Sequence, residues 1–109
     1  LLHRNVIRDN LDIVHLLIDC GADTNFVDEM VYTPLHCAAL MPRAYRQNRE
    51  SIARLLLIRG ANPNATNPRG QTPLHIAAEE GYAKCIRLLL DHGADPNVCD
   101  SYGETPLDL

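Results

Sequence analysis

Aromatic residues are scarce in this chain, which has one Phe, no Trp and four Tyr among 109 residues. Hydrophobic residues still make up 46% of it, so leucine and alanine must do most of the packing, as they can in thin helical layers. No apolar run approaches the roughly 18 residues that a membrane span requires. We therefore expect no insertion into a membrane.

Cysteine pairs are also missing, because none of the four cysteines forms a CxxC motif. Cys37 and Cys85 are expected to be small core residues, and Cys20 and Cys99 to be exposed. This spacing favours neither a disulfide framework nor a zinc site. A reducing compartment, the cytoplasm or the nucleus, is the expected location.

What the chain does contain is an internal repeat. The motif TPLH begins at Thr33 and Thr72, and TPLD begins at Thr105, so the steps are 39 and 33 residues. GAD or GAN recurs with the same two steps, at Gly21, Gly60 and Gly93. Such self-similarity indicates stacked units that bury each other's apolar faces.

The stretch from Thr72 to Gly93 shows what one unit contains. Thr72 has N-cap chemistry and Pro73 suits the first helical position. Gly81 breaks this helix, because glycine enters the left-handed region without a side-chain penalty. A second, more hydrophobic helix follows and ends at Gly93. The unit is therefore predicted to be a helix–turn–helix.

With this period and these motifs, the chain resembles the ankyrin-repeat family over essentially its whole length. The resemblance implies an all-α repeat solenoid of stacked helix–turn–helix units with projecting β-hairpin-like fingers. One array is expected over 1–109, divided into 1–30 (truncated), 31–69, 70–102 and 103–109 (the start of a further unit). Helices are predicted at 2–8, 12–20, 34–41, 46–58, 73–80 and 84–92. Both ends are expected to expose apolar faces, as in a piece of a longer array.

The finger at 26–32 departs from the pattern. Val31 occupies the turn position that Gly70 and Gly103 hold elsewhere. A β-branched residue with positive φ costs about 1–3 kcal/mol, so we expect the backbone to be reshaped here. The finger is also more apolar than its counterparts. Two interpretations stay open: local packing on a neighbouring unit, or a patch that contacts a partner.

The 39-residue step reflects an insertion. Twelve residues separate Ala39 from Ile52, against six between Ala78 and Cys85. Five arginines against Glu50 give residues 41–59 a balance of +4, whereas the whole chain carries −4. The inserted turn is either a solvated loop or a second protein-binding site for an acidic partner. The residues of that alternative site are Arg43, Tyr45, Arg46 and Arg49.

Catalytic and cofactor motifs are not found. His3, His36 and His75 recur with the repeat, and in ankyrin-like units this histidine bonds to threonine and to neighbouring backbone. No phosphate loop, nucleophile elbow or HExxH is present. We expect neither enzyme activity nor a metal, cofactor or small-molecule substrate. The sequence pI of 5.6 argues against binding to nucleic acid.

Recognition of a partner protein is therefore the expected function. In ankyrin repeats the partner usually lies on the concave face, formed by finger tips and exposed positions of the first helices. The corresponding residues here are Ile7, Arg8, Glu29, Met30, Tyr32, Leu40, Met41, Arg69, Gln71, Glu79, Glu80, Tyr102 and Glu104. The four apolar residues of the second unit, Met30, Tyr32, Leu40 and Met41, are the predicted hot spot.

Two larger identities fit this module: an adaptor or substrate-receptor part of a ubiquitin ligase, or a regulatory or structural array that docks on its own polypeptide within an enzyme or channel. Asn25, Asn64 and Asn97 also match the position that asparaginyl hydroxylase modifies in many ankyrin repeats. Asn97, with Leu89 eight residues upstream, fits best.

Overall fold

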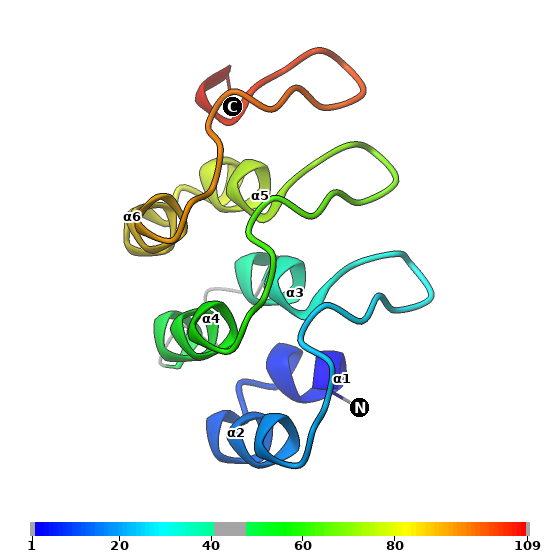
Figure 1. Cartoon of the computed structure of the whole chain (residues 1–109). Coiled ribbons are helices and arrows are strands. Elements are labelled where there is room, and N and C mark those ends of the chain that lie inside the picture. Colours follow the sequence, from blue (N-terminus) through cyan, green and yellow to red (C-terminus); the bar gives the residue numbers. More distant parts are fainter. Residues whose placement is uncertain (1, 41–47, 109) are drawn as a thin grey trace.

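The computed structural model of this protein describes residues 2–40 and 48–108, which form a stack of paired helices. One row of helices holds α1 (Leu2–Ile7), α3 (Pro34–Leu40) and α5 (Pro73–Glu80). The other row holds α2 (Leu11–Asp19), α4 (Arg49–Ile58) and α6 (Ala83–Asp91). A short 3₁₀ helix, η2 (Pro106–Asp108), continues the first row, which we call the inner row (Figure 1).

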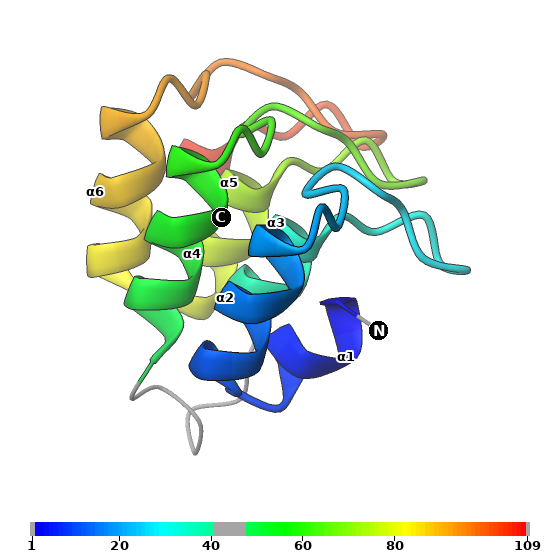
Figure 2. The same ribbon diagram turned by 60° about the horizontal axis from the view of Figure 1, so that its bottom comes forward.

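The array therefore consists of three helix pairs, which we call the first unit (α1 and α2), the second unit (α3 and α4) and the third unit (α5 and α6). Each pair is followed by a projecting loop: the first finger (26–32), the second finger (65–71) and the third finger (98–104). All three fingers extend from the same side of the helices (Figures 1 and 2). No strand is assigned in the described ranges, so the predicted all-α repeat solenoid is confirmed.

The helix boundaries agree with the predicted ones to within one residue in nearly every described case. The exception is α4, which begins at Arg49 after an N-cap at Asn48, and not at residue 46. The predicted start at residue 46 was therefore wrong, because Asn48 lies before the first helical residue. Residues 41–47, which make up most of the insertion, lie outside the described part of the chain.

The start of α5 shows how the repeated motif makes a helix. Thr72 is extended (φ −88°, ψ 166°), and its hydroxyl accepts the N–H of His75. In return, the Thr72 N–H donates to Nδ1 of His75 at 3.1 Å. Pro73 follows at the first helical position, and Gly81 ends the helix in the left-handed region (φ 70°). The capping interactions expected from the sequence are thus present.

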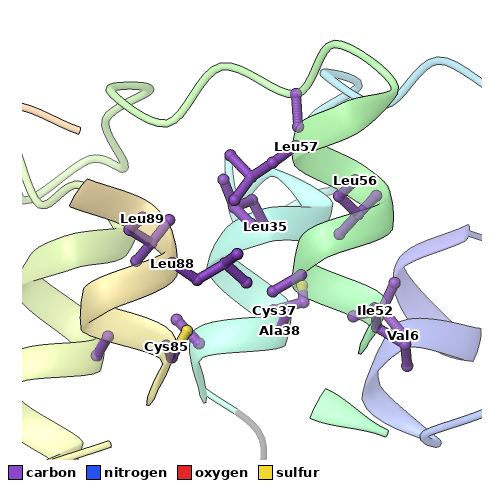
Figure 3. Packing of buried hydrophobic residues seen from close by; sticks show 14 of the residues in the cluster. Val6, Leu35, Cys37, Ala38, Ile52, Leu56, Leu57, Cys85, Leu88 and Leu89 are labelled. Atoms are coloured by element: carbon purple, nitrogen blue, oxygen red, sulfur yellow. The ribbon is translucent and has the colours of Figure 1, made fainter. Parts of the chain in front are cut away.

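The core lies between the two rows and runs through all three units. Leu56 and Leu89, in the last turns of α4 and α6, are fully buried, as the sequence predicted. Cys37 and Cys85 pack among the apolar side chains (Figure 3), while Cys20 and Cys99 are exposed, and all four thiols are free. Burial raises the pKa of Cys37 to about 12. These two thiols therefore behave as small hydrophobic groups.

Each outer helix uses two apolar sides, one for each neighbouring unit. On the side facing the preceding unit, Ile52 and Cys85 are fully buried, whereas Ile13 of the first unit is 45% exposed. On the side facing the following unit, Leu57 is buried and Leu90 of the third unit is 43% exposed. Apolar positions are therefore open at both ends of the described stack, as expected from the sequence.

Asp9 takes the inter-helix turn of the first unit, where Gly81 stands in the third. Its φ is 61°, in the left-handed region that Gly81 also occupies. The expectation that aspartate can replace glycine here is confirmed, because Asp visits this region more readily than most residues.

Candidate protein-interaction surface

A carboxylate or amide at the base of each finger sets its shape. In the first finger, Oδ1 of Asp28 accepts the backbone N–H groups of Met30 and Tyr32, both at 2.9 Å. The Asp28 N–H also donates to the Tyr32 carbonyl at 3.0 Å, as in a β-hairpin. Asn67 and Asp100 make the same bonds in the other two fingers. This shared scaffold fixes where the finger side chains project.

Val31 keeps the backbone conformation of the glycines that it replaces. Its φ is 60°, against 73° for both Gly70 and Gly103. The prediction that the backbone is reshaped at this position was therefore wrong. The scaffold around Asp28 is strong enough to hold a β-branched residue in the left-handed region, where such a residue is strained by about 1–3 kcal/mol.

Contact between successive fingers differs along the array. The Ser101 N–H donates to the Arg69 carbonyl at 2.8 Å, which ties the third finger to the second. Pro68 stands at the position that corresponds to Ser101 in the second finger, and proline has no N–H to donate. The second finger therefore cannot make the equivalent bond to the carbonyl of Met30 in the first finger.

Histidines connect each inner helix to the next finger. His36 Nδ1 accepts the Thr33 N–H at 3.3 Å, so the hydrogen of the neutral ring resides on Nε2. Nε2 then donates to the Gln71 carbonyl at 2.9 Å. His3 and His75 lie in the same way, with Nε2 2.8 Å from the Tyr32 carbonyl and 2.9 Å from the Glu104 carbonyl. The tie between repeats that the resemblance implied is confirmed.

This connection positions several predicted site residues. The backbones of Tyr32, Gln71 and Glu104 are held by the three histidines, and their side chains are half-buried. The Tyr32 ring also lies 5.6 Å from the ring of His36, centroid to centroid. Burial lowers the pKa of His36, although the Gln71 carbonyl and the charge of Asp28 oppose this shift. The neutral imidazole that the connection needs is thereby favoured.

The apolar candidates are accessible where they are described. Met30 is 68% exposed, Ile7 47% and Leu40 43%. Tyr102, at the third finger, is 78% exposed. The remaining charged candidates are exposed or, for Glu80, half-buried: Arg8, Glu29, Arg69, Glu79 and Glu80. Met41, the fourth residue of the predicted hot spot, lies outside the described residues.

Arg49 is not part of an exposed basic site. The structure buries it completely and places its guanidinium 4.6 Å from the centre of the Tyr82 ring. Its Nε donates to the Ala38 carbonyl at 2.9 Å, and Nη2 donates to the Ala39 carbonyl. Arg49 therefore caps the end of α3 and contacts the third unit, which contradicts its assignment to the alternative binding site. Arg43, Tyr45 and Arg46 lie outside the described residues.

Asparagine side chains link successive units in a way that the sequence did not predict. Asn25 Nδ2 donates to the Gly60 carbonyl at 3.0 Å, and its Oδ1 accepts the Asn62 N–H at 2.7 Å. Asn64 makes the corresponding bonds to the Gly93 carbonyl and the Asp95 N–H. Asn97, the third residue of this series, is exposed. Hydroxylation of these asparagines remains a proposal.

A groove at the first finger was also missed. It lies between the first turn of α1 and residues 22–30, with a volume of about 870 Å³. Phe26 and Val27, 64% and 42% exposed, line it together with Met30 and Glu29 from the candidate surface. The available signal was the comparison of Phe26 with Ala65 and Val98, which hold its position in the other fingers.

Two features are absent from the described ranges 2–40 and 48–108. No group of three or more metal-ligating side chains occurs among these residues. In the same part of the chain, no helix is both long and apolar enough to cross a membrane.

The repeated units and projecting fingers define a stacked-repeat interaction module, and the comparisons identify its family. The chain belongs to the ankyrin-repeat family: "Ankyrin repeats (many copies)" matches residues 45–109, and "Ankyrin repeats (3 copies)" matches residues 1–65. Ankyrin repeats are protein–protein interaction modules and are generally non-catalytic. Protein partners are therefore the class of ligand that the family assigns to this segment.

Three similar proteins, all from Homo sapiens, match this chain over part of their own length. It is 35% identical to B-cell lymphoma 3 protein over 78% of this chain and 18% of the relative. It is 41% identical to protein phosphatase 1 regulatory subunit 27, over 63% and 41% of the two chains. With 2-5A-dependent ribonuclease it shares 42% identity over 77% and 11%, so one relative is by name an enzyme. In each case the chain spans less than half of the relative.

Proposed function

We propose that this segment binds a partner protein through its concave surface, meaning the finger tips and the exposed positions of α1, α3 and α5. The observation that carries the proposal is the exposure of Met30 and Leu40, on the first finger and at the end of α3. Tyr32 lies half-buried between finger and helix. Interface hot spots combine apolar and aromatic side chains of this kind.

Two roles of the whole protein are compatible with this binding mode. The first is an adaptor or substrate-receptor part of a ubiquitin ligase. The second is a regulatory or structural array within a larger enzyme or channel, where the concave surface docks on its own polypeptide. The name of one relative, a ribonuclease, fits the second role. Four free cysteines favour the cytoplasm or the nucleus for either role.

The test compares two surfaces of the same protein. Proteins that co-purify with the unmodified chain are quantified against a Met30→Ala variant, a Tyr32→Ala variant and a combined Arg43→Ser, Arg46→Ser variant. We expect Tyr32→Ala to weaken binding of the partner by at least about 2 kcal/mol, measured with the purified partner. Arg49 is left unchanged because it is buried. If only the arginine variant loses the partner, the inserted turn is the site and the concave surface is not.

Changes at the rim provide a second measurement. Arg69 and Glu79 are exposed, so Arg69→Ala or Glu79→Ala is expected to cost less than Tyr32→Ala. Their effect should also depend more strongly on salt, because exposed charges are screened. Thermal unfolding of every variant separates lost binding from lost folding. This control matters most for Tyr32, whose ring contacts His36.

A further inference from the structure

We propose that a groove between the outer helices α4 and α6 binds an acidic segment of a partner protein, in which two carboxylates lie close to an apolar residue. This site is separate from the concave surface, because the fingers project on the side of the inner row, away from α4 and α6 (Figure 1). The groove has a volume of about 390 Å³. We call it the outer groove, and its charged lining residues are Glu50, Arg54, Lys84, Arg87 and Asp91.

The outer groove is cationic on balance. Nη2 of Arg54 lies 2.9 Å from Oε1 of Glu50 on the same helix, so these two charges offset each other. In the described part of the chain, Lys84 and Arg87 of α6 form no ion pair. They leave an excess of positive charge over the carboxylate of Asp91, in a chain whose formal net charge is −4. A carboxylate of a partner is therefore attracted into this groove.

The neighbouring groove between α2 and α4 shows that these cations are not a general feature of the stack. It is lined by Asp12, His15 and Asp19, and no lysine or arginine is among its described lining residues. By the spacing of the repeat, Lys84 stands at the position of Asp12, and Arg87 at the position of His15. The two grooves of the outer row therefore share one architecture but differ in charge.

Helix stability does not account for the lysine. Lys84 is the second residue of α6, at the positive end of the helix dipole, where a cation is unfavourable. The first turns of α2 and α4 instead contain Asp12 and Glu50. The charge of Lys84 thus opposes the local electrostatic preference of its helix, and an anion bound in the outer groove would offset this cost.

An exposed isoleucine beside the outer groove favours an apolar residue in the partner segment. Ile58 lies one turn beyond Arg54 on the same face of α4, and 65% of its surface is exposed. It occupies the position at which the first and third units have Asp19 and Asp91. From Lys84 to Asp91 the groove runs about 10 Å along α6, the length of about three extended residues. A short peptide therefore fits better than a single small anion.

Nucleic acid fits the outer groove less well than an acidic peptide. Strong binding to a phosphate backbone needs cations distributed over a broad surface. Here Glu50, in the first turn of α4, and Asp91, at the end of α6, place negative charge in the same groove. The cations are thus confined to a short segment, which matches a pair of carboxylates.

The experiment titrates the full chain with fluorescent peptides of about twelve residues. The first peptide carries a Glu–Glu–Ser–Leu segment among neutral polar residues. The second has Gln in place of both Glu, and the third has Ser in place of Leu. We expect saturable binding of the first peptide, about tenfold tighter than that of the second and about threefold tighter than that of the third. We also expect this binding to weaken from about 0.05 to about 0.5 M salt.

Amide chemical shifts show where the peptide binds, and variants decide the assignment. The first peptide is expected to perturb Arg54, Lys84 and Arg87. Lys84→Asp, which introduces the residue type of the first unit, and Arg87→Gln should each weaken binding by about fivefold or more. Arg4→Gln is the matched control, because Arg4 is exposed on α1 and does not line the outer groove. Thermal unfolding of each variant separates lost binding from lost folding.

Each remaining outcome contradicts the inference. It is overturned if the first peptide does not saturate, if either of the other peptides binds as well, or if Arg4→Gln reduces binding as much as Arg87→Gln. It is also overturned if an oligonucleotide of about twelve thymidines binds more tightly, because the ligand is then nucleic acid. If the perturbed amides lie on the fingers, the peptide binds the concave surface and the outer groove is not the site. The concave-surface proposal is tested separately, by binding of the purified partner to the Tyr32→Ala variant.

Discussion

The first and third fingers share one hydrogen-bond scaffold but differ in backbone strain and in their bonding to the second finger. Asp28 and Asp100 both hold two backbone N–H groups through Oδ1. The third finger has an unstrained Gly103 at its turn and is tied to the second finger by Ser101. The first finger carries Val31 with φ 60°, and the equivalent backbone bond between it and the second finger is excluded, because Pro68 has no N–H.

This difference shows that the first finger has given up stability that the third has kept. Strained positions persist only where the surroundings determine the backbone strongly, and they cluster at functional sites. Here the strain coincides with the most apolar finger surface, at Phe26 and Met30, and with the groove. Two kinds of contribution to stability can therefore be distinguished. One is the core packing that all units share, and the other comes from local features of a single finger or turn.

The largest expected effect tests the core packing that the second unit, which carries the insertion, shares with the regular third unit. Leu56 and Leu89 are fully buried at equivalent positions of the second and third units. Leu56→Ala and Leu89→Ala should each lower the free energy of unfolding by about 2–5 kcal/mol, because each leaves a cavity. Urea denaturation measures this loss. Leu16→Ala, at an exposed position, is the control and should change it by under about 0.5 kcal/mol. Equal losses at Leu16 would show that the helices are in another register.

The next effect concerns the inserted turn. Arg49→Ala removes two hydrogen bonds to the end of α3 and the contact with Tyr82, so we expect a loss of about 2–4 kcal/mol. Arg54→Ala is the matched change on the same helix. Arg54 is exposed and pairs with Glu50 at 2.9 Å, and such a pair contributes at most about 1 kcal/mol. Similar denaturation midpoints for the two variants would contradict the burial of Arg49.

Exchanging glycine and valine at the turn positions Val31 and Gly70 tests whether the first finger is strained and the second is not. Gly70→Val introduces strain at φ 73° and places a Cβ 3.2 Å from the Ser101 nitrogen. It should therefore destabilise by more than the approximately 1–3 kcal/mol of the conformation alone. Val31→Gly should stabilise by about 1 kcal/mol or less, because relief of strain is offset by the greater freedom of glycine in the unfolded chain. Loss of stability in Val31→Gly would mean that the valine side chain contributes packing instead.

The smallest expected effect is a pH dependence of stability at the hydrogen bond that connects His36 of α3 to the second finger. Burial holds the pKa of His36 below its ordinary 6.5, so the unfolded chain takes up this proton more readily than the native one. Its contribution to stability is complete above about pH 6.5 and is lost as the pH falls through the native pKa. Urea midpoints at about pH 7.5 and about pH 5.5 should reveal this loss. In His36→Gln, this part of the pH dependence should be absent.

Local chemistry explains why so much of the fold could be predicted. The Thr–Pro starts, the terminal glycines and the apolar spacing act within a few residues of one another, so they specify the helix limits directly. Asp9 shows the same, since its capacity for positive φ is intrinsic. The concave candidates could be placed only through the family resemblance. Exposure of Met30 and Leu40 agrees with that placement, while binding by these residues remains to be measured.

Repetition and capping chemistry in the sequence by itself determined the all-α stack, its register and the histidine connections, because each depends on spacing along the chain. Only the tertiary structure decided that Arg49 is buried, that Val31 has a positive φ, that Asn25 and Asn64 bond to the following unit, and that a groove lies at Phe26. Three of these depend on groups farther away along the chain: the end of α3 and the Tyr82 ring, the carbonyls of the next unit, and the start of α1. The backbone of Val31 depends instead on the nearby hydrogen bonds of Asp28, whose combined effect the residue pattern did not reveal. The local sequence limits the conformations and hydrogen bonds that are open to a residue, and its neighbours in the packed structure decide which of these it adopts.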